Sequence, residues 1–313
     1  SELARYPDLL ISNVVVEPAA GWAPGSSVTL RWRVSNAGNA PVTVPWSDGI
    51  QVRNLVSGAL VYNASAGAAI PVNEELAAGA YIERSVSFAW PSGANAIGRF
   101  QFTLSADTGE KIVEGNADGT GESNNTAQLT VTSAPDLRVA NLAVQPQNLK
   151  AGATVTVSWD DLNAGNASPI GGWYDRIQVR NATTGEMLLD NQLQFDPTVG
   201  GAGVPAAGQA RARQFVFTLP AGLRGAGEIE ITVTTDTRND VREVVDGINA
   251  EANNQALITR QAEAVDYPDL AVRALTAPSA ARGGDVIEIA WTVKNNGTVA
   301  TAQSAWSDRI VLS

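Results

Sequence analysis

The sequence has 313 residues, enough for two ordinary domains or three small ones. It carries 32 acidic and 21 basic residues, a net charge of −11, so nucleic acid and other polyanions would be repelled. Cysteine and histidine are absent, which excludes disulfides, thiolate chemistry, Ser-His triads and histidine metal sites. No apolar run approaches the roughly 20 residues of a membrane span. Ser1 is not an initiator methionine and no signal-peptide pattern follows it, so we expect a part of a longer polypeptide.

A four-residue opening occurs three times, about 130 residues apart. Its copies are Tyr6-Pro7-Asp8-Leu9, Ala134-Pro135-Asp136-Leu137 and Tyr267-Pro268-Asp269-Leu270. Abundant Val, Thr, Gly and Pro favour short strands joined by turns. We therefore expect an all-β protein of two complete β-sandwiches, residues 1–133 and 134–266, with residues 267–313 as the first half of a third.

A strand containing a tryptophan follows each opening. In Val28-Leu30-Trp32-Val34 and its two later copies, apolar residues occupy every second place, which predicts a core tryptophan. Each strand leads to an Asn-x-Gly turn, whose residue types tolerate positive φ: Asn36 to Gly38, Asn163 to Gly165 and Asn295 to Gly297. The second unit has Asp161 where the others have Val34 and Val293, and this carboxyl group lies either in water at a strand end or in a pair.

A tryptophan two residues before an aspartate comes next, at Trp46 and Asp48, Trp173 and Asp175, and Trp306 and Asp308. An isoleucine strand follows each aspartate. An aspartate at such a place can accept backbone N–H bonds and fix the turn, which is the interpretation we favour over a share in a metal or ligand site.

A block of acidic and amide side chains is repeated without a change in spacing. Calcium takes six to eight oxygen ligands from carboxylates, amides and carbonyls. The blocks therefore predict a calcium site in each of the first two units. The candidate ligands are Asp107, Glu114, Asp118, Glu122 and Asn124, and then Asp236, Glu243, Asp246, Glu251 and Asn253. The alternative is that the glutamates are solvated while Asn124-Asn125 and Asn253-Asn254 make turn hydrogen bonds.

These motifs together resemble the bacterial CARDB repeats, cell-adhesion-related β-sandwich domains that occur in tandem. The resemblance rests on Pro7-Asp8-Leu9, the Asn-x-Gly turn, the aspartate-glutamate stretch and the Glu-x-Asn-Asn ending at Glu122 to Asn125. It covers nearly the whole chain, the third unit only in part. It implies immunoglobulin-like or fibronectin-III-like sandwiches in adhesion, biofilm or cell-surface architecture. One departure is the longer loop between the two glutamates, Gly115 to Gly121 in the first unit.

Catalysis would have to use the same repeated carboxylates, as a glycosidase-like acid and base. Paired catalytic carboxylates are rarely duplicated in tandem domains, so we expect no enzyme. A carbohydrate-binding module is the stronger rival, because exposed tryptophans could stack on sugars. The candidates are Trp22, Trp46, Trp90, Trp173 and Trp306, for each of which we favour packing in a core or at its edge.

The sequence predicts a beaded rod of sandwiches from an extracellular or bacterial cell-surface protein. Its role would be to extend or assemble, with calcium as a stiffening ion. Expected partners are other repeats of the same polypeptide, surface or matrix glycans, or a second copy. Two alternatives stay open: carbohydrate binding, and a fibre subunit whose incomplete third unit receives a strand from another copy.

Overall fold

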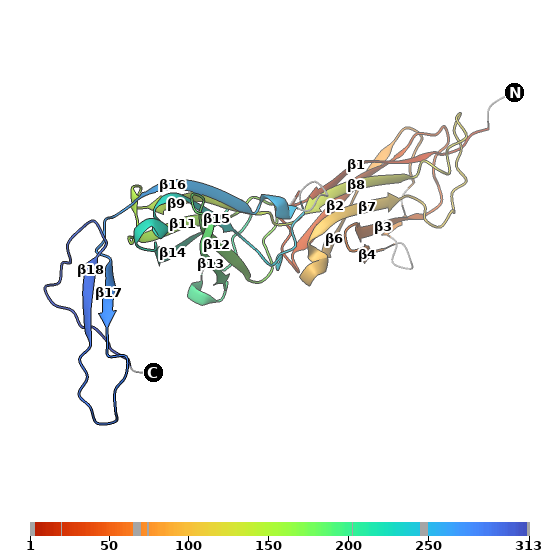
Figure 1. Ribbon diagram of the computed structural model, residues 1–313. Helices are drawn as coiled ribbons and strands as arrows, with labels where there is room; N and C mark the ends of the chain where they lie inside the picture. The colour runs from red at the N-terminus through yellow and green to blue at the C-terminus, as the bar shows by residue number, and fades with distance from the viewer. Residues whose placement is uncertain are drawn as a thin grey trace.

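The computed structural model describes residues 4–19, 21–64, 70–73, 75–201, 203–244 and 250–311. They form two β-sandwiches placed end to end, followed by a two-stranded hairpin (Figure 1). The helical segments of this part are single 3₁₀ turns: η1 (Gly93–Ala96), η2 (Val199–Gly201), η3 (Gly222–Gly225) and η4 (Ala250–Asn253). No helix in these ranges has the length and apolarity needed to cross a bilayer. The all-β prediction is confirmed.

The first sandwich consists of a three-stranded and a five-stranded sheet. The smaller sheet has the order β1-β2-β6, with β1 at Leu9–Glu17, β2 at Ser27–Asn36 and β6 at Tyr81–Ala89. The larger has the order β4-β3-β7-β8, and β5 pairs with β3. Its strands are β3 (Trp46–Asn54), β4 (Leu60–Asn63), β5 (Ile70–Val72), β7 (Gly98–Ser105) and β8 (Thr126–Ser133).

The second sandwich has the same design. Its smaller sheet has the order β14-β11-β9, and its larger sheet the order β10-β16-β15-β12-β13. The strands are β9 (Leu137–Gln145), β10 (Leu149–Lys150), β11 (Thr154–Asn163), β12 (Trp173–Asn181), β13 (Glu186–Phe195), β14 (Ala210–Thr218), β15 (Gly227–Thr234) and β16 (Gln255–Glu263).

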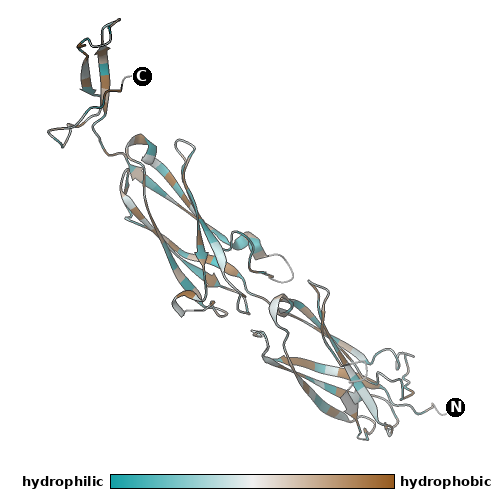
Figure 2. Ribbon diagram, turned by 90° about the horizontal axis from the view of Figure 1, so that it is seen from below, coloured by the Kyte–Doolittle hydropathy of each residue, from teal (hydrophilic) through white to brown (hydrophobic). Residues whose placement is uncertain are grey.

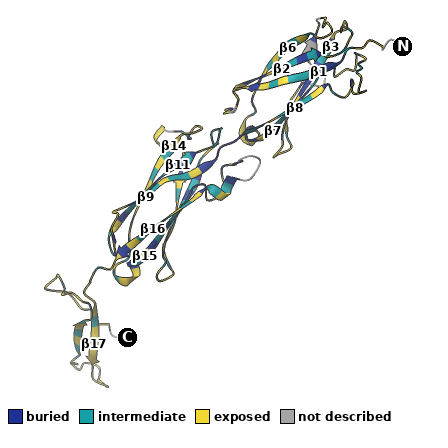
Figure 3. Cartoon of the chain, turned by 90° about the horizontal axis from the view of Figure 1, so that it is seen from above, coloured by how far each residue is buried: buried dark blue, intermediate teal, exposed yellow. Residues whose placement is uncertain are grey.

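The cores lie between the sheets of each sandwich, and alternation along the strands fills them. In β2, Val28, Leu30, Trp32 and Val34 are all fully buried, as the two-residue period predicts. The burial colours that change along the strands in Figure 3, and the changing hydropathy colours in Figure 2, follow the same pattern. Trp22, Trp46, Trp90, Trp159 and Trp173 are buried as well. The prediction of core tryptophans is confirmed for both sandwiches.

Residues 267–311 form a hairpin of β17 (Leu270–Thr276) and β18 (Ala290–Asn295). The sequence predicted a strand from Ile287 and another around Ile310. Instead, β18 begins at Ala290 and residues 305–311 form no strand. In the sandwiches the strand that corresponds to 305–311 is hydrogen-bonded on both sides, for example β12 between β13 and β15, whereas the described residues after 267 supply no such neighbours.

Candidate functional site

The first acidic block connects β7 to β8 and binds the start of β1. The carboxyl group of Glu114 accepts a hydrogen bond from the backbone N–H of Leu9 at 2.5 Å and another from Nδ2 of Asn125 at 2.9 Å. Nδ2 of Asn124 donates to Asp8 at 2.9 Å. The block therefore ties the Pro-Asp-Leu opening to the beginning of β8, two segments more than 100 residues apart in the sequence.

The second block makes the same connection in the second sandwich. Glu243 accepts the N–H of Leu137 at 2.9 Å, and Nδ2 of Asn253 donates to Asp136 at 2.8 Å. Glu251 accepts from Asn254 at 3.3 Å. Two motifs that the sequence presented separately, the opening and the acidic block, are thus the two halves of one hydrogen-bonded contact.

Asp107 and Asp236 open the two blocks with a left-handed backbone, at φ 43° and 45°. The Asp107 carboxylate accepts the N–H of Ile112 at 2.7 Å. That of Asp236 accepts the N–H groups of Asp240 and Val241 at 2.8 and 2.9 Å. Both aspartates therefore hold the turn that aims the following glutamate at β1 or β9.

Burial changes the protonation of these side chains. It raises the pKa of Glu243 to about 8, against the N–H bond from Leu137 and with the help of the Glu251, Asp236 and Asp136 charges. Burial likewise raises the pKa of Glu114 and of Glu251 to about 7 and that of Asp236 to about 6. Near neutral pH Glu243 is therefore largely protonated and Glu114 and Glu251 are partly so, which reduces the desolvation cost of burying these three side chains.

A metal site in the first block would use a different set of oxygens from the predicted one. A cavity of about 420 Å³ lies beside Asp107 and is also lined by Glu110, Glu122 and Asn125. Within the described residues, Oδ1 of Asp107 and Oδ1 of Asn125 are buried without a hydrogen-bond partner. Such oxygens suit calcium.

The other predicted ligands of the first block lie outside this cavity. Glu114 and Asn124 use their side chains on Leu9 and Asp8, and Asp118 is exposed. In the second block, Asp246 falls outside the described residues. No group of three or more Asp, Glu, His or Cys side chains arranged to hold a metal ion occurs in the part of the chain that the structure describes.

The repeated Trp-x-Asp motif has a role that differs from the predicted one. Asp48 lies inside β3, not in a turn before it, and is buried. It accepts the indole N–H groups of Trp32 and Trp46 at 3.2 and 3.1 Å and lies 3.5 Å from Arg84 Nε. The turn interpretation was wrong because an aspartate two residues after an inward tryptophan also points inward. Asp308 accepts the indole N–H of Trp291 in the same way.

Asp161 joins this arrangement in the second sandwich. It is fully buried and accepts the Trp159 indole N–H at 3.0 Å, while Asp175 accepts that of Trp173 at 3.1 Å. One guanidinium serves both carboxyl groups: Arg213 Nε lies 2.9 Å from Asp175 and 3.6 Å from Asp161. Burial, together with the charge of Asp175, raises the pKa of Asp161 well above its usual range. The paired alternative is therefore the right one.

The Asn-x-Gly turns bind the openings. Oδ1 of Asn36 accepts the N–H groups of Asp8 and Gly38 at 3.2 and 3.1 Å, and the Asn163 and Asn295 turns repeat these bonds. The predicted positive φ was wrong, since none of the residues of these turns has it. Gly38 is needed for space instead: a Cβ there would lie 2.3 Å from the carbonyl oxygen of Tyr6.

The tryptophan candidates for sugar stacking are mostly inaccessible. Trp22, Trp46, Trp90 and Trp173 are each no more than 2% exposed, and only Trp306, at 52%, presents a large surface. Trp22 and Trp90 contact each other with ring centroids 4.3 Å apart, inside the core of the first sandwich. The two sandwiches thus keep these four rings from any ligand.

Residues 6–129 match the family model CARDB, whose domains are immunoglobulin-like β-sandwiches. This match points to a non-catalytic, adhesion-related domain. A search of curated proteins found no significant match.

A search of solved structures matched this chain to a red sea bream transglutaminase and to the CARDB domain of a Pyrococcus furiosus protein, among others. The transglutaminase has 12% identity and a TM-score of 0.35 over 84% of this chain, which spans 32% of that protein. The Pyrococcus domain, crystallised with di-metal ions, has 22% identity and a TM-score of 0.27, covering 42% of this chain and 96% of its own. Its solution NMR structure has 19% identity and the same TM-score, covering 42% of this chain and 97% of its own.

Proposed function

We propose that this chain is a non-catalytic extension module of an adhesion-related protein at a bacterial cell surface or outside the cell. Its sandwiches would be tandem units of a longer rod. The CARDB match of residues 6–129 supports the adhesion-related setting. One observation carries the proposal. The side chains of the acidic blocks form hydrogen bonds to the starts of β1 and β9 of the same chain.

The hydrogen bonds of the first acidic block lie at the end of the sandwich where the chain enters. Glu114 and Asn124 hold the start of β1 beside the start of β8, and β8 then runs eight residues further to Ser133. An extended strand of that length covers roughly 26 Å. The chain therefore enters a sandwich at one end and leaves at the other, so each unit adds its long dimension to the rod. Tension on the chain would act directly on the tied segment.

Calcium remains part of the proposal in a narrower form. An ion in the cavity beside Asp107 would satisfy the two unpartnered oxygens of Asp107 and Asn125, with Glu122 lining the same space. It would offset the repulsion among these side chains and stiffen the loop that ends at β8.

Self-assembly is a second candidate, favoured by the apolar residues of the hairpin 267–311. Val272, Leu275 and Ile310 are 60%, 69% and 56% exposed. A second copy that adds a strand to β18 would cover part of this surface. Sedimentation at increasing concentration distinguishes the candidates, because an assembling chain gains mass and a simple extension module stays monomeric.

Single-molecule pulling of the full chain from its two ends tests the extension role. We expect two discrete unfolding events, each releasing a contour length on the order of 400 Å for one sandwich. Glu114→Ala should lower the force of one event, while the matched change Glu75→Ala, at an exposed glutamate, should not. Unfolding without resistance, or tight binding on a glycan array by the untethered chain, would contradict the proposal.

A further inference from the structure

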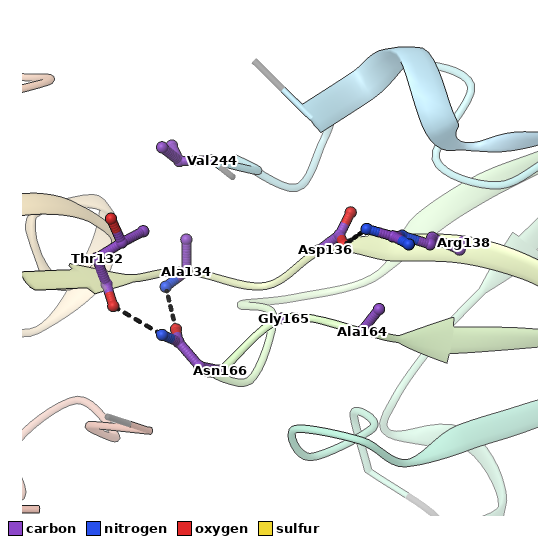
Figure 4. A pocket seen from close by; sticks show the side chains of 8 residues that line it. All are labelled: Thr132, Ala134, Asp136, Arg138, Ala164, Gly165, Asn166 and Val244. Carbon is purple, nitrogen blue, oxygen red and sulfur yellow. Dashed lines mark hydrogen bonds and ion pairs between the residues drawn. The ribbon is translucent and has the colours of Figure 1, made fainter. Parts of the chain in front are cut away.

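The connection between the sandwiches is very short. β8 ends at Ser133 and β9 begins at Leu137, which leaves residues 134–136 between them. Figure 4 shows that the turn after β11 lies against this segment. The surrounding contacts decide whether three residues act as a hinge or as a fixed joint.

One side chain of the second sandwich holds both sides of the connection. Oδ1 of Asn166 accepts the backbone N–H of Ala134 at 2.9 Å, and Nδ2 donates to the carbonyl oxygen of Thr132, in β8, at 2.7 Å (Figure 4). The backbone N–H of Asn166 also donates to the carbonyl oxygen of Ala134 at 3.0 Å. Asn166 therefore fixes the direction in which the chain leaves the first sandwich relative to the second.

An apolar contact closes the other side of the connection. Ile97 of the first sandwich, Ala134 of the connection and Val244 of the second acidic block form a small cluster. Their exposed fractions are 4%, 2% and 8%. Val244 follows Glu243, whose bond to Leu137 anchors the beginning of β9. The acidic block of the second sandwich is thus part of the contact between the two units.

The same turn in the first sandwich provides an internal comparison. Asn39 occupies the place of Asn166 and accepts the N–H of Tyr6 at 2.8 Å, while its own N–H donates to the carbonyl oxygen of Tyr6 at 2.9 Å. Tyr6 is 41% exposed, whereas Ala134 at the same place is 2% exposed. The turns at Asn39 and Asn166 therefore make the same local hydrogen bonds. The bond from Asn166 to Thr132 and the burial of Ala134 occur only where the two sandwiches meet.

We propose that Asn166 and the Ile97–Ala134–Val244 cluster make this connection a fixed joint, so that the two sandwiches turn as one rigid body. The inference rests on the proposed extension role and adds the residues that would give the rod its stiffness at this point. A rod keeps its reach only if its joints resist bending, and here the resistance comes from one amide and three apolar side chains.

Double electron–electron resonance on the full chain measures the joint directly. The chain has no cysteine, so Val56→Cys and Val216→Cys, at exposed positions of the two sandwiches, place the only labels. We expect a narrow distance distribution, broadened about twofold or more by Asn166→Ala. Asn166→Asp keeps the acceptor for Ala134 but loses the donor to Thr132, and should broaden the distribution without unfolding the turn.

Asn39→Asp is the matched control, because it alters the same turn away from the joint and should leave the distribution narrow. A broad distribution in the unmodified chain, or no broadening by either Asn166 variant, overturns the inference. So does equal broadening by Asn39→Asp. If the joint is mobile, the two sandwiches still unfold in separate events under force. Failure of the fixed-joint inference is therefore distinguishable from failure of the proposed extension role.

Discussion

The carboxyl group of Glu243 accepts a hydrogen bond from the backbone N–H of Leu137 at 2.9 Å, although 106 residues separate them in the sequence. Glu114 and Leu9 repeat this relationship across 105 residues in the first sandwich. In each sandwich a loop before the last strand holds the beginning of the first one. This contact closes the sandwich at the end where the chain enters.

Removing the acceptor should destabilise the second sandwich. Glu243→Ala leaves the buried N–H of Leu137 without a partner, and we expect a loss of about 1–3 kcal/mol in the free energy of unfolding. Glu243→Gln retains a carbonyl acceptor and should lose clearly less. Urea denaturation with a probe for the second sandwich measures both, with Glu228→Ala at an exposed site as the control. Equal losses for the Ala and Gln variants would contradict this account.

The same glutamate makes stability depend on pH. The folded-state pKa of Glu243 is about 8, above its ordinary value of 4.5, so the folded chain binds a proton more tightly than the unfolded one. Its contribution is complete below pH 4.5 and is lost as the pH rises toward 8. We expect Glu243→Gln to flatten the fall in melting temperature across this window. A variant whose profile matches that of the unmodified chain would show that Glu243 does not titrate there.

Asp161 should be replaceable by the valine of the first sandwich. Asp161→Val removes one carboxyl group from the pair and leaves Asp175 with Arg213, as Asp48 stands with Arg84. We expect the free energy of unfolding to change by less than about 1.5 kcal/mol, because the change removes one of two like carboxyl groups beside a single guanidinium. The Trp159 indole N–H loses Asp161 as its acceptor but can turn to Asp175, as the Trp32 indole N–H donates to Asp48. Arg213→Met leaves carboxyl groups without their cation and should cost about 3–5 kcal/mol. The reverse order of the two losses would refute the pairing.

Gly165 should tolerate no side chain. A Cβ there would lie 2.4 Å from the carbonyl oxygen of Ala134 and 2.5 Å from the N–H nitrogen of Asp136, both backbone atoms that cannot move aside. We expect Gly165→Ala to lower the melting temperature of the second sandwich by several degrees, from a loss of about 1–3 kcal/mol. Gly283→Ala, with no atom within 4 Å of its Cβ, is the control and should have no measurable effect.

Calcium should raise the melting temperature of the first sandwich. At a concentration about ten times the dissociation constant, binding adds about 1.4 kcal/mol to the free energy of unfolding. Asp107→Asn together with Glu122→Gln should abolish the rise seen against excess chelator. Asp118→Asn should leave it unchanged, since this side chain is exposed and lies outside the cavity. If millimolar calcium gives no rise, the cavity is not a calcium site.

The strand pattern and the repeats were readable from the sequence. Alternation placed Trp32 and Trp159 in the cores, because successive side chains of a strand point to opposite faces. The recurring openings and acidic blocks were recognisable as equivalent by spacing alone. Continuing the same alternation through Asp48 and Asp161 would also have predicted that both side chains point inward, because both residues lie within strands.

The sequence by itself determined the all-β class, the repetition and the faces that become core, because these depend on residues close together in the chain. The tertiary structure alone decided what the polar side chains bind. Glu243 meets Leu137, Asp161 meets Arg213, and Gly165 meets the Ala134 carbonyl only after the sheets have paired. A local pattern fixes where a side chain points but not which distant backbone or charge folding brings opposite it.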